Sequence, residues 1–181
     1  RSKIKELKKY FVILFLVVSG FSFLLTDKKP TIFLIGDSTM ANKPLDENPE
    51  KGWGQLFPKY MTDDVEIQNH AVNGRSTKSF LKEHRWDTVM SRMKAGDYVM
   101  IQFGHNDSKV EDSNRSAPAH TLYKENLIRY INDTRSKDAT PILITPVMRR
   151  KFDATGKFVD QHGDYPGVVK EVAAAMNVLL I

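Results

Sequence analysis

Short apolar runs separated by amphipathic stretches constrain the fold of this chain more than any other feature. Mostly apolar runs are typical of parallel strands buried on both faces, whereas alternation of apolar and polar residues indicates a strand nearer the sheet edge. The apolar runs are 31–35, 97–103 and 141–145, the alternating one is 65–71, and a last run begins at Val178. Helical patterns lie between them, at 52–60, 76–93, 122–135 and 164–176. This alternation predicts a three-layer α/β/α sandwich with a central parallel sheet and a flavodoxin-like strand order.

The chain of 181 residues is long enough for one domain with a sizeable core. We expect that domain to occupy residues 30–181 and to be monomeric. Residues 151–160 predict a hairpin that turns at Thr155-Gly156. Because the last predicted strand is not followed by a crossover, we expect the domain to be incomplete at its C-terminus.

The first 29 residues predict a targeting segment followed by a short linker. Residues 1–9 are basic, and Tyr10 to Leu25 form an uncharged, mostly apolar run. A basic region before an apolar one is the pattern of a secretory signal, and a spanning helix needs about 20 apolar residues. We therefore expect a cleaved signal peptide and a secreted or periplasmic protein. A retained N-terminal membrane anchor is the alternative, and a buried helix is a third interpretation.

The net charge of +5 comes entirely from that segment, so it does not indicate nucleic-acid binding. Residues 1–29 hold seven Lys and Arg against two acidic residues, and the remaining residues hold 20 of each sign. The absence of cysteine excludes disulfides, thiolate metal sites and a cysteine nucleophile.

Polar turns follow three of the predicted strands and supply the candidate site. They are Gly36-Asp37-Ser38, Asn73-Gly74-Arg75 and Gly104-His105-Asn106-Asp107. Each alone is better explained as a turn or a helix cap than as part of a site, but the carboxyl ends of parallel strands share one crevice. There Ser38 is a candidate nucleophile for acyl transfer. The backbone N–H groups of Ser38 and Gly74 and the amide of Asn106 are candidate donors to the oxyanion.

These three blocks resemble the first three blocks of the SGNH (GDSL-type) hydrolase superfamily, in order and at suitable spacing. The longer phrases 36–40, 52–54, 104–107 and 162–166 are most similar to rhamnogalacturonan acetylesterases, secreted carbohydrate esterases that deacetylate pectin. The resemblance implies that Ser38 is the nucleophile and that the Ser38 and Gly74 N–H groups and the Asn106 side chain form the oxyanion hole. It implies no metal and no organic cofactor.

The chain departs from the superfamily at the catalytic base. The resemblance implies an Asp-x-x-His block near the C-terminus, but no Asp in this sequence is followed by His three residues later. A serine hydroxyl without a base is a poor nucleophile. Either the sequence is a truncated piece or another histidine substitutes. His105 fits a turn better than a base, and His162 either lines the substrate cleft or is simply exposed.

We therefore expect a serine esterase that removes O-acetyl groups from a plant cell-wall polysaccharide when full length. An esterase or lipase of other specificity is the nearest alternative. An inactive carbohydrate-binding module is another, because the base is missing. Trp53, Trp86 and Tyr165 are aromatic candidates for stacking on sugars, although packing in the core explains them equally well.

Overall fold

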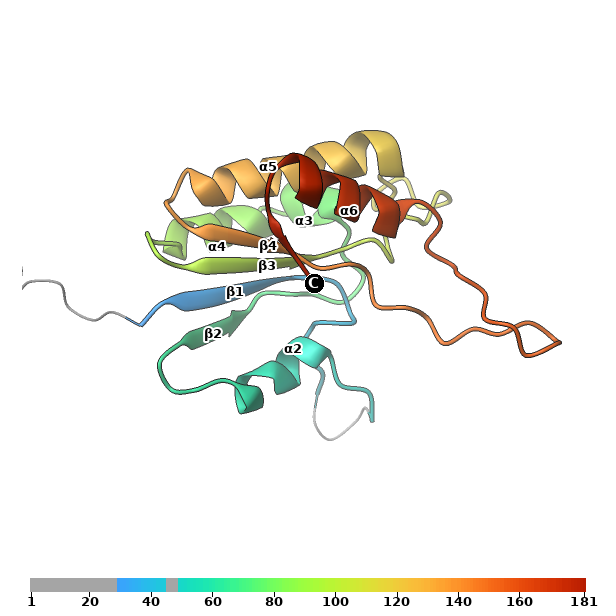
Figure 1. Cartoon of the computed structure of the whole chain (residues 1–181), viewed down its shortest axis with the longest axis horizontal. Helices are drawn as coiled ribbons and strands as arrows, with labels where there is room; N and C mark the ends of the chain where they lie inside the picture. Colours follow the sequence, from blue (N-terminus) through green and yellow to red (C-terminus); the bar gives the residue numbers. More distant parts are fainter. Residues whose placement is uncertain (1–28, 45–48) are drawn as a thin grey trace, which may run out of the picture.

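The computed structural model describes residues 29–44 and 49–181 (Figure 1). The predicted targeting segment, residues 1–29, lies outside the described residues apart from Lys29. The sheet has five parallel strands in the order β2-β1-β3-β4-β5, so the predicted parallel sheet and flavodoxin-like order are confirmed. The strands are β1 (Thr31–Gly36), β2 (Glu66–Asn69), β3 (Tyr98–Gln102), β4 (Thr140–Leu143) and β5 (Leu179–Leu180).

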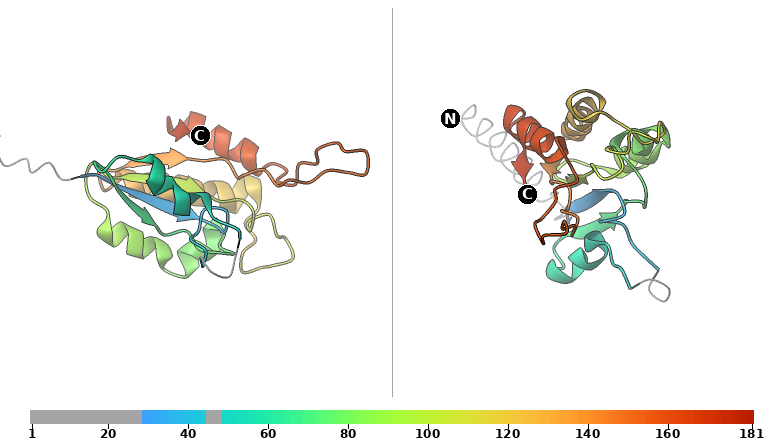
Figure 2. Two further views of the ribbon diagram at one scale, coloured as in Figure 1. Left: turned by 90° about the horizontal axis from the view of Figure 1, so that it is seen from below. Right: turned by 90° about the vertical axis from the view of Figure 1, so that its right-hand side faces the viewer.

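Helices cover the two faces of the sheet unequally (Figures 1 and 2). The connections from β2 to β3, β3 to β4 and β4 to β5 all advance in one direction across the sheet, so right-handed crossovers place their helices on one face. The connection from β1 to β2 runs the other way and places its helix on the opposite face. The first face carries α3 (Thr77–Lys82), α4 (Arg85–Arg92), a π-helical turn η3 (Ala119–Tyr123), α5 (Lys124–Arg135) and α6 (Tyr165–Ala175). The second carries α2 (Trp53–Leu56) and the 3₁₀ turn η2 (Phe57–Tyr60).

Alternate residues of β1 pack into two different hydrophobic clusters on opposite faces of the sheet. Phe33 and Ile35 pack into the larger cluster beneath α3 to α6, and Ile32 and Leu34 into the smaller one beneath α2. All four side chains are buried, as expected for a central parallel strand. Among the described residues, no helix combines the length and the apolar character that crossing a membrane requires.

The prediction of one helix over 76–93 is wrong, because the chain breaks at His84. His84 has a left-handed backbone with φ of 57°, which ends α3 and lets α4 start in a new direction. The start of α3 is as expected: the Ser76 hydroxyl accepts a hydrogen bond from the Ser79 N–H. The predicted helix over 52–60 tightens into a 3₁₀ turn at its end, with Pro58 in the first turn of η2.

The predicted hairpin at 151–160 is confirmed. Phe152 and Phe158 form an antiparallel bridge, and the Asp153 N–H donates to the Lys157 carbonyl. Gly156 occupies the left-handed region at the turn, with φ of 81°.

Close approach of β1 to β3 makes Gly36 sensitive to any side chain. A Cβ added at Gly36 would lie 2.6 Å from the Gln102 carbonyl oxygen and 3.1 Å from Met40 Sδ. We expect Gly36→Ala to force the strands apart and to lower the free energy of unfolding by about 1–3 kcal/mol in urea denaturation.

The matched control is Gly167→Ala within α6, where a new Cβ meets nothing within 4 Å. Because alanine is the better helix former, this control is expected to raise the free energy of unfolding by about 0.5–1 kcal/mol. Equal effects of the two substitutions would contradict the steric argument.

Candidate active site

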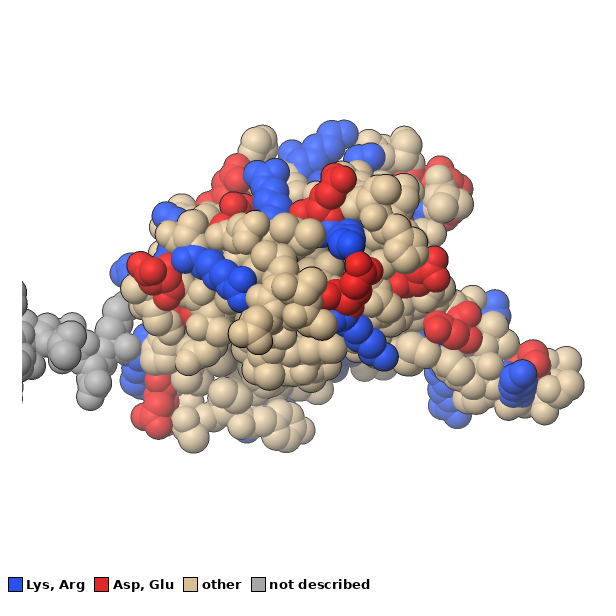
Figure 3. Space-filling view, turned by 45° about the horizontal axis from the view of Figure 1, so that its top comes forward, with Lys and Arg blue, Asp and Glu red and all other residues tan. Residues whose placement is uncertain are grey.

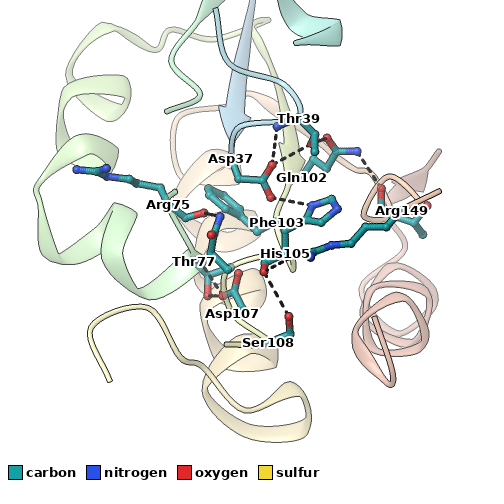
Figure 4. A network of polar contacts seen from close by, with 12 residues as sticks. Asp37, Thr39, Arg75, Thr77, Gln102, Phe103, His105, Asp107, Ser108 and Arg149 are labelled. Carbon is teal, nitrogen blue, oxygen red and sulfur yellow. Dashed lines mark hydrogen bonds and ion pairs between the residues drawn. The ribbon is translucent and has the colours of Figure 1, made fainter. Parts of the chain in front are cut away.

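The carboxylate of Asp37 joins the ends of β1 and β3 (Figure 4). Its Oδ1 accepts hydrogen bonds from the backbone N–H and the hydroxyl of Thr39, both at 2.9 Å. Its Oδ2 lies 3.2 Å from Nδ1 of His105, in the turn after β3. Asp37 is 0% exposed. One buried carboxylate therefore holds the turn that carries Ser38 and the turn that carries Asn106.

The side chain of Asn106 is fixed at both of its polar atoms. Its Nδ2 donates to the Arg75 carbonyl at 3.0 Å, and its Oδ1 accepts from Nη1 of Arg115 at 3.3 Å. The same Nη1 is the nearest atom to a Cβ built on Gly74, at 3.8 Å. The turn after β2 and the turn after β3 are thus in contact, and Gly74 and Asn106 lie around one guanidinium.

Ser38 opens onto a cavity of about 550 Å³. Trp53, Thr39, Lys43 and Val147 also line it, together with Glu50, Lys51 and Leu56. The Trp53 indole N–H donates to Gln102 Oε1 at 2.7 Å, and Gln102 Nε2 donates to the Thr145 carbonyl at 2.9 Å. Gln102 at the end of β3 therefore supports the wall of the cavity beside Ser38.

The groups with candidate roles in acyl transfer are left unpaired by the described part of the chain. The Ser38 hydroxyl makes no hydrogen bond there, and neither the Ser38 nor the Gly74 backbone N–H has an acceptor. Asn106 Nδ2 uses one of its two N–H bonds on Arg75. Gly74 has φ of 76°, a conformation that glycine adopts without strain. The candidate nucleophile and the three candidate donors therefore each keep a free hydroxyl or N–H group in the described part of the chain.

Asp107 lies beneath the site and is 0% exposed. Its Oδ1 accepts from the backbone N–H and the hydroxyl of Thr77 at the start of α3, but its Oδ2 has no partner in the described part of the chain. Burial raises the pKa of Asp107 from its usual 3.8 to about 7, against the lowering effect of the Thr77 hydrogen bonds. The neutral acid therefore persists up to about pH 7.

The ring of His162 packs on the ring of His105, edge to face, with centroids 4.6 Å apart. It is 2% exposed and neither of its nitrogens has a hydrogen-bond partner among the described residues. Burial, followed by the charges of His105 and Arg149, lowers the pKa of His162 below its usual value. The alternative that His162 is simply exposed is wrong, because its ring is buried against His105. Its predicted role in substrate binding stays a prediction.

No cluster of three or more His, Asp or Glu side chains suited to a metal ion occurs in residues 29–44 and 49–181.

Comparison with known proteins identifies the family. The GDSL-like lipase/acylhydrolase family matches residues 34–181, which include all three turns of the site. This chain belongs to that family. The predicted membership of the SGNH (GDSL-type) superfamily is thereby confirmed.

Two relatives of this GDSL-like chain come from Bacillus subtilis. The rhamnogalacturonan acetylesterase RhgT of Bacillus subtilis is 38% identical over 155 residues, which make up 85% of this chain and 65% of RhgT. The probable rhamnogalacturonan acetylesterase YesY of the same species is 36% identical over 83% of this chain and 68% of its own length. The chain therefore spans about two thirds of the length of these relatives.

Solved structures agree with the GDSL-like fold. The structure of YxiM from Bacillus subtilis is 28% identical, with a TM-score of 0.74 over 85% of this chain and 43% of that chain. Axe2, an acetylxylan esterase from Geobacillus stearothermophilus, has a TM-score of 0.58 over 84% of this chain and 75% of its own. At 18% identity, Axe2 supports the fold alone.

The structure brings the turns of Ser38, Gly74 and Asn106 together but separates the aromatic candidates. Trp53 lines the Ser38 cavity, whereas Trp86 and Tyr165 are buried in the larger core cluster. Sequence reasoning missed Arg115 and Gln102. Arg115 lies in a long polar loop with no local signal, and Gln102 is one polar residue inside an apolar strand.

The Asp37 carboxylate supports a first prediction for the site. Asp37→Asn replaces one acceptor oxygen by an N–H group that faces Nδ1 of His105. We expect the free energy of unfolding to fall by about 1.5–3 kcal/mol, as for hydrogen bonds to charged groups. Urea denaturation at pH 7 measures this loss.

The control is Asp153→Asn in an exposed turn, where the carboxylate also accepts several hydrogen bonds. A change as large in the control would show that burial of Asp37 is irrelevant.

The raised pKa of Asp107 supports a second prediction. In the folded protein the acid titrates near pH 7, and in the unfolded chain near 3.8. Between these values only the unfolded state loses the proton, so this residue makes folding less favourable as the pH rises from about 4 to 7, with no further change above. The free energy of unfolding then falls by at most about 1.4 kcal/mol for each pH unit.

Asp107→Asn removes this dependence while keeping an acceptor oxygen for Thr77. We therefore expect the stability of the variant, relative to the unsubstituted protein, to improve steadily from pH 4 to pH 7 and then level off. Denaturation midpoints across this range measure the difference. A flat difference curve would show that Asp107 is ionised throughout.

Proposed function

We propose that the full-length protein is a serine esterase that removes acetyl groups from rhamnogalacturonan, the acetylated polysaccharide of pectin. One observation carries this proposal: Ser38 lines an open cavity and its hydroxyl has no hydrogen-bond partner among the described residues. The adjoining turns hold three N–H groups without an acceptor there, those of Ser38 and Gly74 and the second N–H of the Asn106 amide. Such donors stabilise the charge that develops on a carbonyl oxygen during acyl transfer, at about 3 kcal/mol each.

The reaction proceeds in two steps. Ser38 Oγ attacks the acetyl carbonyl carbon and its proton passes to a base, while the carbonyl oxygen becomes an oxyanion held by the three donors. Collapse of this intermediate breaks the bond to the sugar oxygen, which leaves as the protonated hydroxyl, and acetyl-Ser38 remains. Water then attacks the carbonyl carbon of acetyl-Ser38, gives up a proton to the base and forms a second oxyanion on the same donors. Collapse of this second intermediate breaks the bond between Ser38 Oγ and the acetyl carbon, returns the proton to Ser38 and releases acetate.

Two features of the site suit this chemistry. The Asn106 amide does not titrate, so its donor persists at any working pH. Arg115 and the Arg75 carbonyl hold the amide in one orientation, so no reorganisation is needed as charge develops.

No hydrogen bond joins Ser38 to His105 or His162 in the described part of the chain, and no Asp in the sequence is followed by His three residues later. The experiments below therefore use the full-length protein.

The substrate class is supported by the names of the relatives, since RhgT and YesY are described as rhamnogalacturonan acetylesterases. A polysaccharide of the plant cell wall lies outside the cell. We accordingly propose secretion directed by the N-terminal segment, with anchoring by the same segment as the alternative.

A second candidate function is hydrolysis of esters with longer acyl chains. An apolar groove of about 490 Å³ shares Trp53 and Val147 with the Ser38 cavity. Met100, Ile144 and Phe57 also line it, so an acyl chain longer than acetyl would find apolar surface next to the nucleophile.

The proposed function predicts that Ser38→Ala lowers acetate release from acetylated pectin by a factor on the order of 10⁶. Mass spectrometry of the rapidly quenched unsubstituted protein should show one added acetyl group on Ser38, absent from the variant. The control is Ser91→Ala, which removes an exposed hydroxyl in α4 that bonds only the Thr88 carbonyl.

Acetate release that survives Ser38→Ala would refute the assignment of the nucleophile. Faster hydrolysis of p-nitrophenyl octanoate than of acetyl esters would favour the second candidate function. Binding of pectin fragments without any hydrolysis by the full-length protein would favour an inactive carbohydrate-binding module.

A further inference from the structure

Residues 147–163, here called the arm, leave the domain between β4 and α6. The arm projects beyond the rest of the molecule in Figure 1 and in the left view of Figure 2, and Figure 3 shows Lys and Arg side chains along it. Local hydrogen bonds order its tip, where Asp153 Oδ1 accepts from Thr155 and Lys157 and the Val159 N–H donates to the Lys151 carbonyl. The arm is therefore a formed hairpin rather than an irregular loop.

The tip exposes aromatic surface that the described part of the chain does not cover. Phe152 is 52% exposed and Phe158 is 42% exposed. The two rings pack edge to face with centroids 6.1 Å apart. Val147 and Met148 at the base of the arm are also exposed. Exposed apolar surface concentrated on one projecting element marks an interaction site more often than scattered single residues do.

The arm is also cationic, although residues 30–181 as a whole are neutral. It carries Arg149, Arg150, Lys151 and Lys157 against two acids. Both acids are occupied, since Asp153 accepts the hydrogen bonds of the turn and Asp160 accepts from the His162 N–H. The side chains of Arg150, Lys151 and Lys157 make no hydrogen bond or ion pair with any described residue. Positive charge is thus available at the tip for an anionic partner.

The base of the arm belongs to the wall of the candidate active site. Val147 lines the Ser38 cavity, and Arg149 Nη2 donates to the His105 carbonyl at 3.3 Å. Lys43 also lines the cavity and adds a further cation, with its Nζ donating to Asn73 Oδ1 at 2.9 Å. A long substrate seated at Ser38 can therefore extend along the arm.

We propose that the arm is a second contact for an acidic polysaccharide chain whose acetyl group sits at Ser38. The proposal rests on the proposed function and adds the part of the molecule that selects an anionic polymer. The rings of Phe152 and Phe158 pack against the apolar faces of the sugar rings, and Arg150, Lys151 and Lys157 attract the uronate carboxylates. An anionic membrane surface fits the charge but not the continuity with the Ser38 cavity.

Two arm variants of the full-length protein separate the two kinds of contact. The charge variant is Arg150→Ala with Lys151→Ala and Lys157→Ala, and the aromatic variant is Phe152→Ala with Phe158→Ala. The matched control removes three exposed lysines near the amino-terminal ends of the strands, Lys59, Lys94 and Lys137, and so changes the net charge equally. Each is combined with Ser38→Ala, so that binding is measured without turnover.

Isothermal titration with polygalacturonate at low salt is the main measurement. We expect the charge variant to bind about tenfold more weakly, from three exposed ion pairs, and the control to bind normally. The loss should vanish near 1 M salt, where the Debye length is about 3 Å. The aromatic variant should lose affinity at every salt concentration, for polygalacturonate and for neutral xylan.

In the active protein, the ratio of kcat/KM on acetylated pectin to kcat/KM on p-nitrophenyl acetate should fall by the same factor in the charge variant. Unchanged polygalacturonate affinity in both arm variants would overturn the proposal. The proposal would also be overturned if the protein bound vesicles containing phosphatidylglycerol but had no affinity for polygalacturonate. Protection of Phe152 and Phe158 from hydroxyl radicals before any polymer is added would overturn it too, because the arm would then be an internal contact.

The arm and the proposed function can fail separately. If the active protein releases no acetate from pectin while arm-dependent binding of polygalacturonate persists, the esterase assignment is lost and the arm proposal stands. If acetate release depends on Ser38 but no arm variant changes affinity, only the arm proposal is lost.

Discussion

The buried carboxylate of Asp37 is the contact on which the geometry of the site depends. It binds Thr39 on its own turn and His105 on the turn after β3. Ser38 directly follows Asp37 and Asn106 directly follows His105, so the contact positions the proposed nucleophile relative to a proposed oxyanion donor. The close approach of β1 and β3 at Gly36 makes it short enough to form. A carboxylate with no exposure is stable only when hydrogen-bonded in this way.

Around this contact, most polar groups are paired, whereas the groups with proposed roles in acyl transfer are not. Asn106 combines the two, because only one N–H of its amide is used, on the Arg75 carbonyl. Gln102 and Thr77 each bond to a neighbouring turn, while the Ser38 hydroxyl and the Ser38 and Gly74 N–H groups have no partner in the described part of the chain. Asp107 is the exception, since one of its oxygens is buried without a partner. Its neutral form removes most of the penalty of that burial, which is the physical reason for its raised pKa.

Most of the fold could be predicted because only a few topologies can connect the strands of a parallel sheet. Apolar runs of strand length, separated by helical patterns, leave little besides a doubly wound sheet, and the right-handed crossover rule then assigns helices to faces. The break of the predicted 76–93 helix at His84 could not be predicted. Its local sequence is compatible with a continuous helix, and packing of α3 and α4 against the core imposes the turn there.

The amino-acid sequence by itself determined which residue types end each strand, and therefore that Ser38, Gly74 and Asn106 meet at one edge of the sheet. That inference needs only the direction of the strands. Only the tertiary structure decided which neighbours hold those residues. Arg115, Gln102 and the Arg75 carbonyl reach the site from loops and strands with no periodic pattern, so their partners depend on distances in the folded chain. The projection of the arm from the wall of the site is likewise a property of the assembled domain, because a hairpin signal carries no information about direction.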